Sequence, residues 1–516
     1  MSDNLERLAN HVILIIIDDL RSEHFFKFYD EGKLPNIKKL AEEGIKCRNC
    51  ITTYPSITLP SQSTIMTGAY TGNYKIRGNG IPAYHWFDRD AEKPQYRHYS
   101  MTEAVNLKND IGPNVKTLFE QIGEGNSYSS FQVCSRGVDK RFPDHAFTGL
   151  MFALWYFKIV GKPEKGHSMV VDKILKAFQN PEKYFGNSDR PIAVTGYFPI
   201  TDYLMHKYGF DSERYIKSIL DIDVEIGRLT AGLNDLNILD DTVICIVTDH
   251  GNYKADKAMD IALFFEEKGF IPYNNKTQEG DFDCVFGSLG FFNFRGDSWH
   301  QHPDLHILHN FKPKNSLEPL DLINMMFEIE GVRYVFYRAD GNTHDKGRIK
   351  IRMKDEKGAI HKAGIEYGDE GTRYFYNDLD VFGYENDVVA SKMLDKKFHT
   401  ADEWLEHTYH IDFPMIIDQL PRYFNNPRSC DILVSTCGDV CYNYEHGKTK
   451  GDGVYGHDIG LRSSMVVPLI FGGSSKIPQM EIEYSKVADI VPTLLEFLGK
   501  EPDKSVDGKS LLDWRE

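Results

Sequence analysis

The chain has 516 residues, 41% of them hydrophobic, and a formal net charge of −16 at pH 7. This size supports an extensive buried core, built either as one large domain with an insertion or as two domains. The negative charge argues against binding to a nucleic acid duplex, because a phosphate backbone requires a basic surface. Any phosphorylated substrate must therefore be attracted by local cations, such as bound metal ions.

No stretch of the sequence approaches the ~18 apolar residues of a membrane span. The apolar run at 12–17 is followed by two aspartates and by no small-residue cleavage site, so it does not have the form of a secretion signal. We therefore predict a cytoplasmic protein without a membrane span. The eight cysteines are expected to be free thiols, although Cys47 with Cys50 and Cys437 with Cys441 allow a zinc or redox site as an alternative.

Short apolar runs alternate with helical periodicity in the first half of the chain. The runs at 12–17, 192–197 and 243–247 predict buried strands. The segment 35–44 predicts a short helix closed by glycine, and 212–233 predicts an amphipathic helix that leads to the third strand. Such strand–helix–strand units predict an α/β fold whose core is a mostly parallel sheet between two layers of helices.

The composition changes after about residue 258, where aromatic and charged residues become dense. The alternating residues at 348–354 and 373–376 favour antiparallel hairpins over buried parallel strands. We therefore predict an inserted α+β cap at 258–400, between two parts of a catalytic core at 1–257 and 401–516. The core is expected to resume through strands at 431–435 and 465–470 and a closing helix at 487–498.

Acidic and imidazole side chains lie at the ends of the predicted strands, where open α/β sheets place their chemistry. The motif DYLMH sets Asp202 and His206 one helical turn apart, within reach of one ion. Six such groups suggest two metal ions: Asp18, Asp202, His206, Asp249, His250 and His457.

The segment YPSITLPSQSTIMTG, at 54–68, contains a candidate nucleophile. Thr58 lies just before Pro60, which suits the first turn of a helix whose N-terminus faces an anion. A threonine hydroxyl is a weak nucleophile until a metal lowers its pKa, and the Asp/His groups suit that task. We therefore predict a phosphothreonine intermediate. The alternative interpretation is a Ser/Thr-rich turn that only caps a helix.

In this order, the motifs resemble the alkaline phosphatase superfamily and, within it, the type I phosphodiesterase and nucleotide pyrophosphatase branch. They are IDDLR with Asp18, PSITLPS with Thr58, DYLMH with Asp202 and His206, TDHG with Asp249 and His250, and GHDIGLRSSMVVPLIFGG with His457. The resemblance extends over about 1–257 and 400–516, and it implies an alkaline-phosphatase-like core.

The resemblance also implies two divalent metal ions, with Zn²⁺ favoured and Mn²⁺, Fe or Mg²⁺ as alternatives. One ion would be held by Asp202, His206 and His457. The other would be held by Asp18, Asp249, His250 and the Thr58 oxygen. The candidate substrate-binding residues are Ser61, Lys75, Arg77 and Asn79.

The sequence departs from the family pattern at several of these positions. Ser61 stands where the family has an asparagine, and Lys75 and Arg77 are equally consistent with solvated charges. His446, which is followed by a glycine, is a rival to His457 as a ligand, although the spacing from His457 to the next strand fits the family better.

We therefore predict a metal-dependent hydrolase that cleaves phosphoric diesters or pyrophosphates in a small phosphorylated substrate. The alternatives are a phosphomonoesterase of the same superfamily and a non-catalytic protein that binds phosphorylated ligands. A sulfatase is disfavoured, because Thr58 cannot be converted to formylglycine and Gln62 replaces an arginine. The sequence does not specify the leaving group or the oligomeric state. Five aromatic residues are expected either to cover the substrate or to pack against the cap: Tyr54, Tyr74, Tyr84, Trp86 and Phe87.

Overall fold

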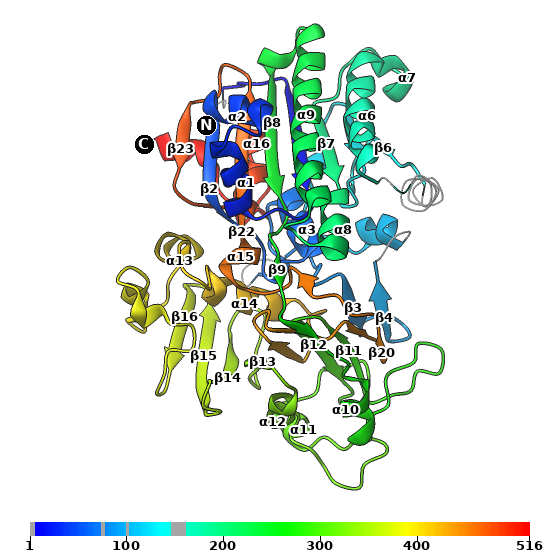
Figure 1. The fold of residues 1–516 in the computed structure, drawn as a ribbon, viewed down its shortest axis with the longest axis vertical. Helices are drawn as coiled ribbons and strands as arrows, with labels where there is room; N and C mark the ends of the chain where they lie inside the picture. Colours follow the sequence, from blue (N-terminus) through cyan, green and yellow to red (C-terminus); the bar gives the residue numbers. More distant parts are fainter. Residues whose placement is uncertain (1–5, 74–77, 100–102, 146–160, 162, 516) are drawn as a thin grey trace.

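The computed structural model describes residues 6–73, 78–99, 103–145, 161 and 163–515. They form two stacked parts, each built on a large sheet (Figure 1). The first part holds both termini and most of the N-terminal half of the chain, and the second holds most of the segment between about 260 and 450. The prediction of a mixed α/β fold is confirmed.

The first sheet has nine strands in the order β23-β2-β22-β8-β1-β7-β5-β6, with β24 paired to β2. Its central strands are parallel: β1 lies between β7 and β8, with Ile13 opposite Val194 and Ile17 opposite Thr248. β22 is antiparallel to both of its neighbours. The bounds are β1 His11–Ile17, β2 Ile45–Ile51, β5 Ser127–Ser130, β6 Lys140–Phe142, β7 Ala193–Phe198, β8 Thr242–Thr248, β22 Val466–Gly473, β23 Met480–Ile482 and β24 Ser485–Lys486.

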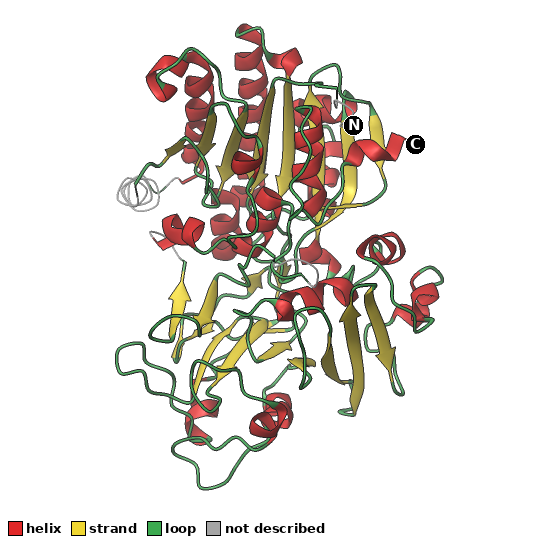
Figure 2. Cartoon of the chain, turned by 180° about the vertical axis from the view of Figure 1, so that it is seen from behind, coloured by secondary structure: helices red, strands yellow, loops and turns green. Residues whose placement is uncertain are grey.

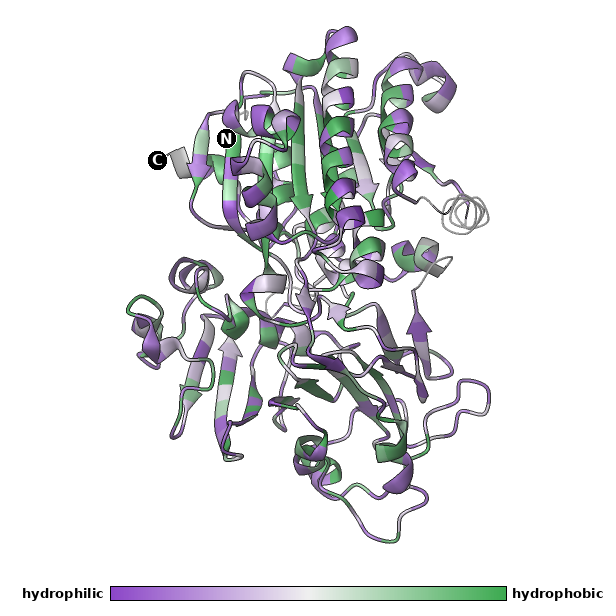
Figure 3. Cartoon of the chain, viewed as in Figure 1, coloured by the Kyte–Doolittle hydropathy of each residue, from purple (hydrophilic) through white to green (hydrophobic). Residues whose placement is uncertain are grey.

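Helices cover both faces of this sheet, as Figure 2 shows from behind. Alternate residues of β1 point to opposite faces: Ile13 packs with one layer of helices, and Leu14 packs with the other. The strands are apolar while the outer surfaces of the helices are polar (Figure 3). The first layer is α1 Ser22–Asp30, α2 Pro35–Glu42, α6 His167–Gln179 and α9 Glu213–Asp235, and the second includes α3 Thr58–Thr67, α4 Leu118–Gln121 and α16 Ile490–Phe497. The helices predicted at 35–44, 212–233 and 487–498 thus correspond to α2, α9 and α16.

The second sheet is antiparallel, in the order β16-β15-β14-β13-β17-β12-β11-β19-β20. The hairpins predicted from the alternation at 348–354 are confirmed, because β15 pairs with β14 on one side and β16 on the other. The bounds are β11 Phe282–Phe286, β12 Leu289–Phe294, β13 Tyr334–Arg338, β14 Gly347–Lys354, β15 Ile360–Gly368, β16 Gly371–Tyr376, β17 Ile432–Ser435, β19 Tyr444–Glu445 and β20 Lys448–Thr449.

One expected strand lies in the other sheet. The segment 431–435 was expected to return to the first sheet, but β17 pairs with β12 and β13 in the second sheet. A strand of four buried residues has the same apolar sequence pattern in either sheet, so the pattern does not specify its partners. The second sheet therefore takes strands from beyond residue 400.

Smaller elements connect and cover the two sheets. The short pair formed by β9 Tyr253–Lys254 and β21 Tyr455–Gly456 lies where the chain passes from one part to the other (Figure 1). Two further pairs are β3 His85–Asp88 with β4 Gln95–His98, and β10 Lys257–Ala258 with β18 Val440–Cys441. The other helices are α7 Pro181–Phe185, α8 Ile200–Tyr208, α10 Ala262–Glu267, α11 Leu305–His309, α12 Leu322–Met325, α13 Ala401–Thr408, α14 Ile416–Asn425 and α15 Arg462–Met465. Within the described residues, no helix has the length and apolar character needed to cross a bilayer.

Candidate metal centre and nucleophile

The predicted ligands meet at the carboxyl edge of the first sheet, on the side that faces the second. Asp18 follows β1 directly, and Asp249 follows β8 directly. Asp202 and His206 lie one turn apart on α8, the helix that follows β7. Because β1 pairs in parallel with β7 and β8, these strand ends lie side by side.

The first ligand set consists of Asp202, His206 and His457. Asp202 Oδ1 lies 3.3 Å from His206 Nε2 and 3.7 Å from His457 Nε2. One ligand atom from each residue lies within 4.8 Å of the other two. The three side chains that the resemblance implies as one ligand set therefore lie close together.

The second set surrounds His250. Its Nε2 atom lies 3.4 Å from Asp18 Oδ1, 3.7 Å from Asp249 Oδ1 and 3.2 Å from Thr58 Oγ1. Asp18, Asp202 and His250 also form a group whose ligand atoms lie within 4.8 Å of one another. The rings of His250 and His457 stack with centroids 3.8 Å apart. The two sets are therefore parts of one continuous cluster.

The three histidines are held in the same way. Nδ1 of His206 donates to the Tyr455 carbonyl at 2.8 Å, that of His250 to Gly251 at 3.0 Å, and that of His457 to Ser56 at 3.0 Å. Because a carbonyl oxygen only accepts, each Nδ1 carries the hydrogen. In its neutral form each ring therefore has its lone pair on Nε2, which faces the cluster, and this is the arrangement that metal-binding histidines show.

Hydrogen bonds from neighbouring groups orient the carboxylates. Gln62 Nε2 donates to Asp249 Oδ2 at 2.7 Å, and the Tyr197 hydroxyl donates to Asp18 Oδ2. Within the described part of the chain, Oδ1 of Asp18 and Oδ1 of Asp202 are buried and accept no hydrogen bond. Buried carboxylate oxygens of this kind suit a cation, so the residues fit the metal ions that the donor set implies.

The second set concentrates negative charge in a buried place. Burial, followed by repulsion from Asp249 and Asp202, raises the pKa of Asp18 well above its usual value. Burial also raises the pKa of Asp249. Burial alone would lower the pKa of His250, but Asp249 and Asp18 hold it well above its usual value. The carboxylates therefore call for positive charge, which divalent ions supply.

In the first set the carboxyl pKa is lowered and the two histidines shift in opposite directions. Burial would lower the pKa of His206, but Asp202 raises it to about 9. Burial would raise the pKa of Asp202, but His206 and His457 hold it below its usual value. Burial, with His250 nearby, lowers the pKa of His457 well below its usual value, so this ring is a neutral donor.

Thr58 is the one accessible side chain in its segment. It begins α3, and every other residue from 51 to 73 is buried. The N-terminal turn of a helix presents unpaired backbone N–H groups, which favour an anion beside the Thr58 hydroxyl. Ser56 connects the segment before α3 to His457. Its hydroxyl donates to the His457 carbonyl at 2.6 Å, and its own carbonyl accepts from His457 Nδ1.

Comparison with known proteins assigns the chain that carries this cluster to a family. The family model described as type I phosphodiesterase / nucleotide pyrophosphatase matches residues 12–356, which is more than half of the chain. The chain belongs to this family. The match includes Asp18, Thr58, Asp249 and His250, while His457 lies beyond it. The assignment confirms the resemblance to the type I phosphodiesterase and nucleotide pyrophosphatase branch.

Individual relatives are distant. An uncharacterised pyrophosphatase/phosphodiesterase of Schizosaccharomyces pombe is 27% identical over 240 residues, 46% of this chain and 44% of its own length. A bis(5'-adenosyl)-triphosphatase of Mus musculus is 24% identical over 255 residues, 48% of each chain. The chain spans about half the length of these curated relatives. The solved murine ectonucleotide pyrophosphatase/phosphodiesterase 5 shares the fold, with a TM-score of 0.54 and 12% identity over 98% of both chains.

Of the four candidate substrate-binding residues, the two that the structure describes lie in different surroundings. Ser61, which replaces the family's asparagine, is buried in α3, and within the described residues its hydroxyl has no hydrogen-bond partner. Asn79 instead holds a turn: its amide donates to the Ala69 carbonyl at 2.7 Å, and its oxygen accepts from the Ile81 N–H at 3.0 Å. Lys75 and Arg77 lie outside the described residues.

His446 is not part of the family's metal cluster. Its Nδ1 lies 2.6 Å from Asp283 in the second part of the molecule, and it is absent from both ligand sets. His457 is therefore the histidine that the structure brings to Asp202.

Most of the aromatic residues near Thr58 pack in the core. Tyr54 and Phe87 are buried in separate apolar clusters, and Trp86 stacks on Tyr99 at 4.8 Å. Tyr84 is half-buried at the edge of two clusters, and Tyr74 lies outside the described residues.

The pocket that opens beside His206 and His457 has a volume of about 190 Å³. The aromatic residues that line it are not the five expected from the sequence. The wall includes Phe286 and Phe291 of the second sheet, and Tyr253. These residues lie about 200 positions or more after Thr58, so no local pattern connects them with it. Gln62 was also missed, although it lies one helical turn after Thr58 and on the same face.

The cysteine pairs do not form a metal site in the described part of the chain. All eight cysteines are free, and no group of potential metal ligands contains one. Cys47 and Cys50 lie on β2, where burial raises the pKa of Cys47 to about 12. Such thiols stay protonated and unreactive.

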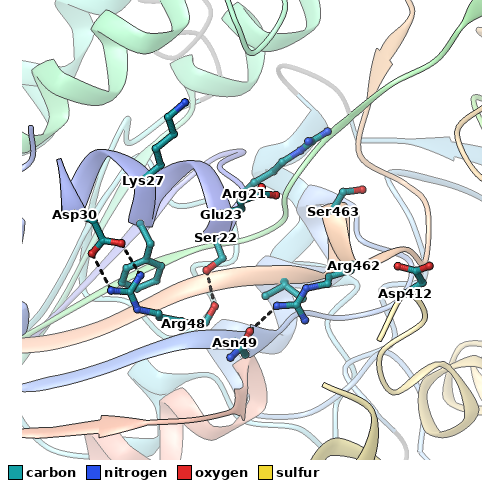
Figure 4. A pocket seen from close by; sticks show the side chains of 12 residues that line it. Arg21, Ser22, Glu23, Lys27, Asp30, Arg48, Asn49, Asp412, Arg462 and Ser463 are labelled. Carbon is teal, nitrogen blue, oxygen red and sulfur yellow. Dashed lines mark hydrogen bonds and ion pairs between the residues drawn. The ribbon is translucent and has the colours of Figure 1, made fainter. Parts of the chain in front are cut away.

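A larger cavity, of about 800 Å³, lies beside α1 and contains none of the predicted ligands (Figure 4). Its charged side chains are largely paired: Arg48 binds Asp30 through two hydrogen bonds, and Arg462 donates to Asn49. Arg21, from the motif that contains Asp18, donates to the Asn252 carbonyl at 2.6 Å.

Proposed function

We propose that the chain is a metal-dependent hydrolase that cleaves phosphoric diesters or pyrophosphates with Thr58 as its nucleophile. The observation that carries the proposal is the 3.2 Å separation between Thr58 Oγ1 and His250 Nε2, beside buried Asp18 and Asp249. An accessible hydroxyl at a helix N-terminus meets an anionic metal-ligand cluster at this point.

Asp202, His206 and His457 would hold one divalent ion, and Asp18, Asp249, His250 and the Thr58 oxygen would hold the other. When bound, such ions lower the pKa of a coordinated hydroxyl and stabilise negative charge on the phosphoryl oxygens and the leaving group. Zn²⁺ best suits the mixture of imidazole and carboxylate donors.

The residues of the chain then perform two displacements. The Thr58 hydroxyl releases its proton to solvent and its Oγ1 attacks phosphorus. The bond from phosphorus to the leaving oxygen breaks, and the phosphoryl group, which keeps its second substituent, becomes bonded to Thr58. The N-terminal turn of α3 orients the phosphoryl oxygens through its backbone N–H groups. A water molecule next attacks phosphorus, breaks the bond to Oγ1 and restores the hydroxyl.

The family description and the pocket support the substrate class. The relatives' names specify pyrophosphatases, phosphodiesterases and a bis(5'-adenosyl)-triphosphatase. The aromatic wall formed by Phe286, Phe291 and Tyr253 suits a planar leaving group such as a nucleoside or an aryl alcohol. The cytoplasmic location remains a prediction from the sequence.

The test compares Thr58→Ala with the matched variant Thr58→Ser on a nitrophenyl phosphodiester. We expect the alanine variant to lose at least about 10³-fold in kcat, because it lacks the reacting oxygen. The serine variant keeps a hydroxyl and should retain measurable turnover. After rapid acid quenching, mass spectrometry should detect residue 58 bonded to the phosphoryl group with its remaining ester group. Near-normal turnover by the alanine variant would exclude Thr58 as the nucleophile and would favour a different reaction or a binding role.

A further inference from the structure

A second group of imidazole and carboxylate side chains lies outside the cluster described above. His85 on β3 and His98 on β4 are directly opposite each other in an antiparallel pair, and their ring centroids are 4.0 Å apart. Glu445 on β19 reaches both: its carboxylate oxygens lie 3.6 Å from His85 Nε2 and 3.9 Å from His98 Nε2. The β3–β4 hairpin and β19, which are far apart in the sequence, thus bring three potential ligands together.

The distances suit a small divalent ion. One ligand atom from each of the three residues lies within 4.8 Å of the other two. Bonds from zinc to nitrogen or oxygen are about 2.0–2.2 Å long, so a tetrahedral ion separates its ligands by roughly 3.3–3.6 Å. The observed 3.6 and 3.9 Å therefore lie within a few tenths of an ångström of the separation that zinc requires.

Hydrogen bonding does not account for the burial of His85. This side chain is only 7% exposed, and among the described residues its Nδ1 has no hydrogen-bond partner. Its other ring nitrogen faces Glu445. Burial lowers the pKa of both His85 and His98.

The surroundings include a fourth imidazole. His446 follows Glu445, and its ring centroid is 5.8 Å from that of His85. Its Nδ1 lies 2.6 Å from the Asp283 carboxylate, which accepts the ring hydrogen and leaves the lone pair on Nε2. Within the described residues, that buried Nε2 makes no hydrogen bond. Histidine ligands commonly donate to a carboxylate in this way.

An ion can reach the group from solvent. Glu445 also lines the pocket that opens beside His206 and His457, which provides a path of entry. The neighbouring positive charge is Lys450, whose Nζ lies 3.2 Å from Glu445 and whose side chain is 53% exposed. A lysine this exposed can swing into water when an ion takes its place.

We propose that His85, His98 and Glu445 form a third metal site, which binds a divalent ion of the zinc class. His446, supported by Asp283, stands next to it as a further imidazole. The site shares no ligand with the two sets around Asp202 and His250, and the proposal does not depend on the hydrolytic function.

The test is the zinc content of the full chain after equilibration with excess zinc and removal of free metal. His98→Ala should bind one equivalent less than the wild type, and so should Glu445→Gln, which keeps the shape of the side chain. The matched control is His361→Ala, because His361 also lies between two carboxylates, 3.1 Å from Asp355 and 2.8 Å from Asp378, but belongs to no ligand group. It should bind as much zinc as the wild type.

The same measurement in an Asp249→Asn background separates this site from the family's metal cluster. Loss of one equivalent with His98→Ala in that background would support the third site even if the other ions had already been lost. Crystals soaked in zinc should also show an anomalous peak between His85, His98 and Glu445. Equal zinc content in folded wild type, His98→Ala and Glu445→Gln, or a soaked crystal with no peak there, would overturn the proposal.

Discussion

The Tyr197 hydroxyl donates a hydrogen bond to Asp18, a residue 179 positions earlier in the chain. The parallel register explains this contact, because Tyr197 lies opposite Ile16 on the neighbouring strand. Tyr197 occupies one carboxylate oxygen of Asp18 and leaves the other facing His250 at 3.4 Å. Strand pairing thus orients a candidate metal ligand through a residue that is not itself in either ligand set.

Replacing Tyr197 by phenylalanine should therefore weaken metal binding without removing a ligand. Residues that support ligands in this way typically contribute about 10–100-fold in metal affinity or activity. We expect a loss of this size in zinc affinity, measured by competition with a chromophoric chelator, and partial recovery of activity at high zinc concentration.

Tyr334→Phe is the matched control for this change. Tyr334 is also buried and also donates its hydroxyl hydrogen, but to the Val381 carbonyl in the second part of the molecule. It should lose stability and keep its zinc affinity. Equal zinc affinity in the Tyr197 and Tyr334 variants would show that the contact with Asp18 has no role in metal binding.

Chelation and Asp249→Asn should both remove activity, but only the first effect should be reversible. Asp249 is fully buried and supplies negative charge beside His250, and an asparagine keeps its shape without that charge. Zn²⁺ or Mn²⁺ should restore the chelated wild type and restore the variant only weakly. Asp223→Asn is a suitable control, because Asp223 is equally buried but accepts from the Asn36 and Ile37 N–H groups at the start of α2. Full activity of the wild type in excess chelator would contradict metal dependence.

Asp18 and Asp249 could be placed at the carboxyl edge of the first sheet from the sequence, because a short, apolar strand directly precedes each. The carboxyl ends of parallel strands meet at one edge of a sheet, and this rule alone predicts that the two residues lie close together. The division of six residues into two ligand sets rested on the resemblance to the family. The position of β17 could not be predicted in this way. Its four residues are all buried, and an apolar run of that length is compatible with either sheet.

Contacts between segments far apart in the sequence form the other features that the sequence did not predict. The pocket wall at Phe286 and Phe291 comes from β11 and β12, whose distance from Thr58 is set by the packing of the two parts. The group formed by His85, His98 and Glu445 likewise depends on the register of one hairpin and on where β19 packs. No spacing in the sequence encodes either arrangement. Helical periodicity, in contrast, could have placed Gln62 on the same face as Thr58, because it lies one turn later.

Metal-stripped protein should lose stability as the pH rises. Burial raises the pKa of Asp19 to about 8, and Asp202 raises that of His206 to about 9 against the effect of burial. Both values exceed the ordinary ones of 3.8 and 6.5, so the folded state binds these protons more tightly than the unfolded state. The stabilisation is complete below the ordinary pKa of each group and disappears as the pH passes its raised value.

We therefore expect the Tm of the metal-stripped protein to fall between about pH 4, where unfolded Asp19 begins to release its proton, and about pH 9. Added zinc should flatten the profile, because cations then balance the carboxylates in place of protons. Asp19→Asn should show a shallower slope, since its amide has no proton to lose. Scanning calorimetry at four pH values, with and without zinc, measures each of these effects, and a Tm that rises with pH in the stripped protein would contradict the assigned shifts.

The preference between diesters and monoesters depends on what surrounds the substrate beyond the metal cluster. A monoester dianion carries an additional negative charge, which a phosphatase typically matches with a further fixed cation. Among the described residues that line the pocket, Lys450 is the only lysine or arginine, and it is paired with Glu445 at 3.2 Å. The opposite wall, which includes Phe286 and Phe291, is apolar and suits a second ester group. We therefore expect a higher kcat/KM for a nitrophenyl phosphodiester than for the corresponding monoester, compared at equal metal occupancy. A clear preference for the monoester would assign the chain to the phosphomonoesterases of the superfamily and would indicate a cation at the site that the pocket's described residues do not supply.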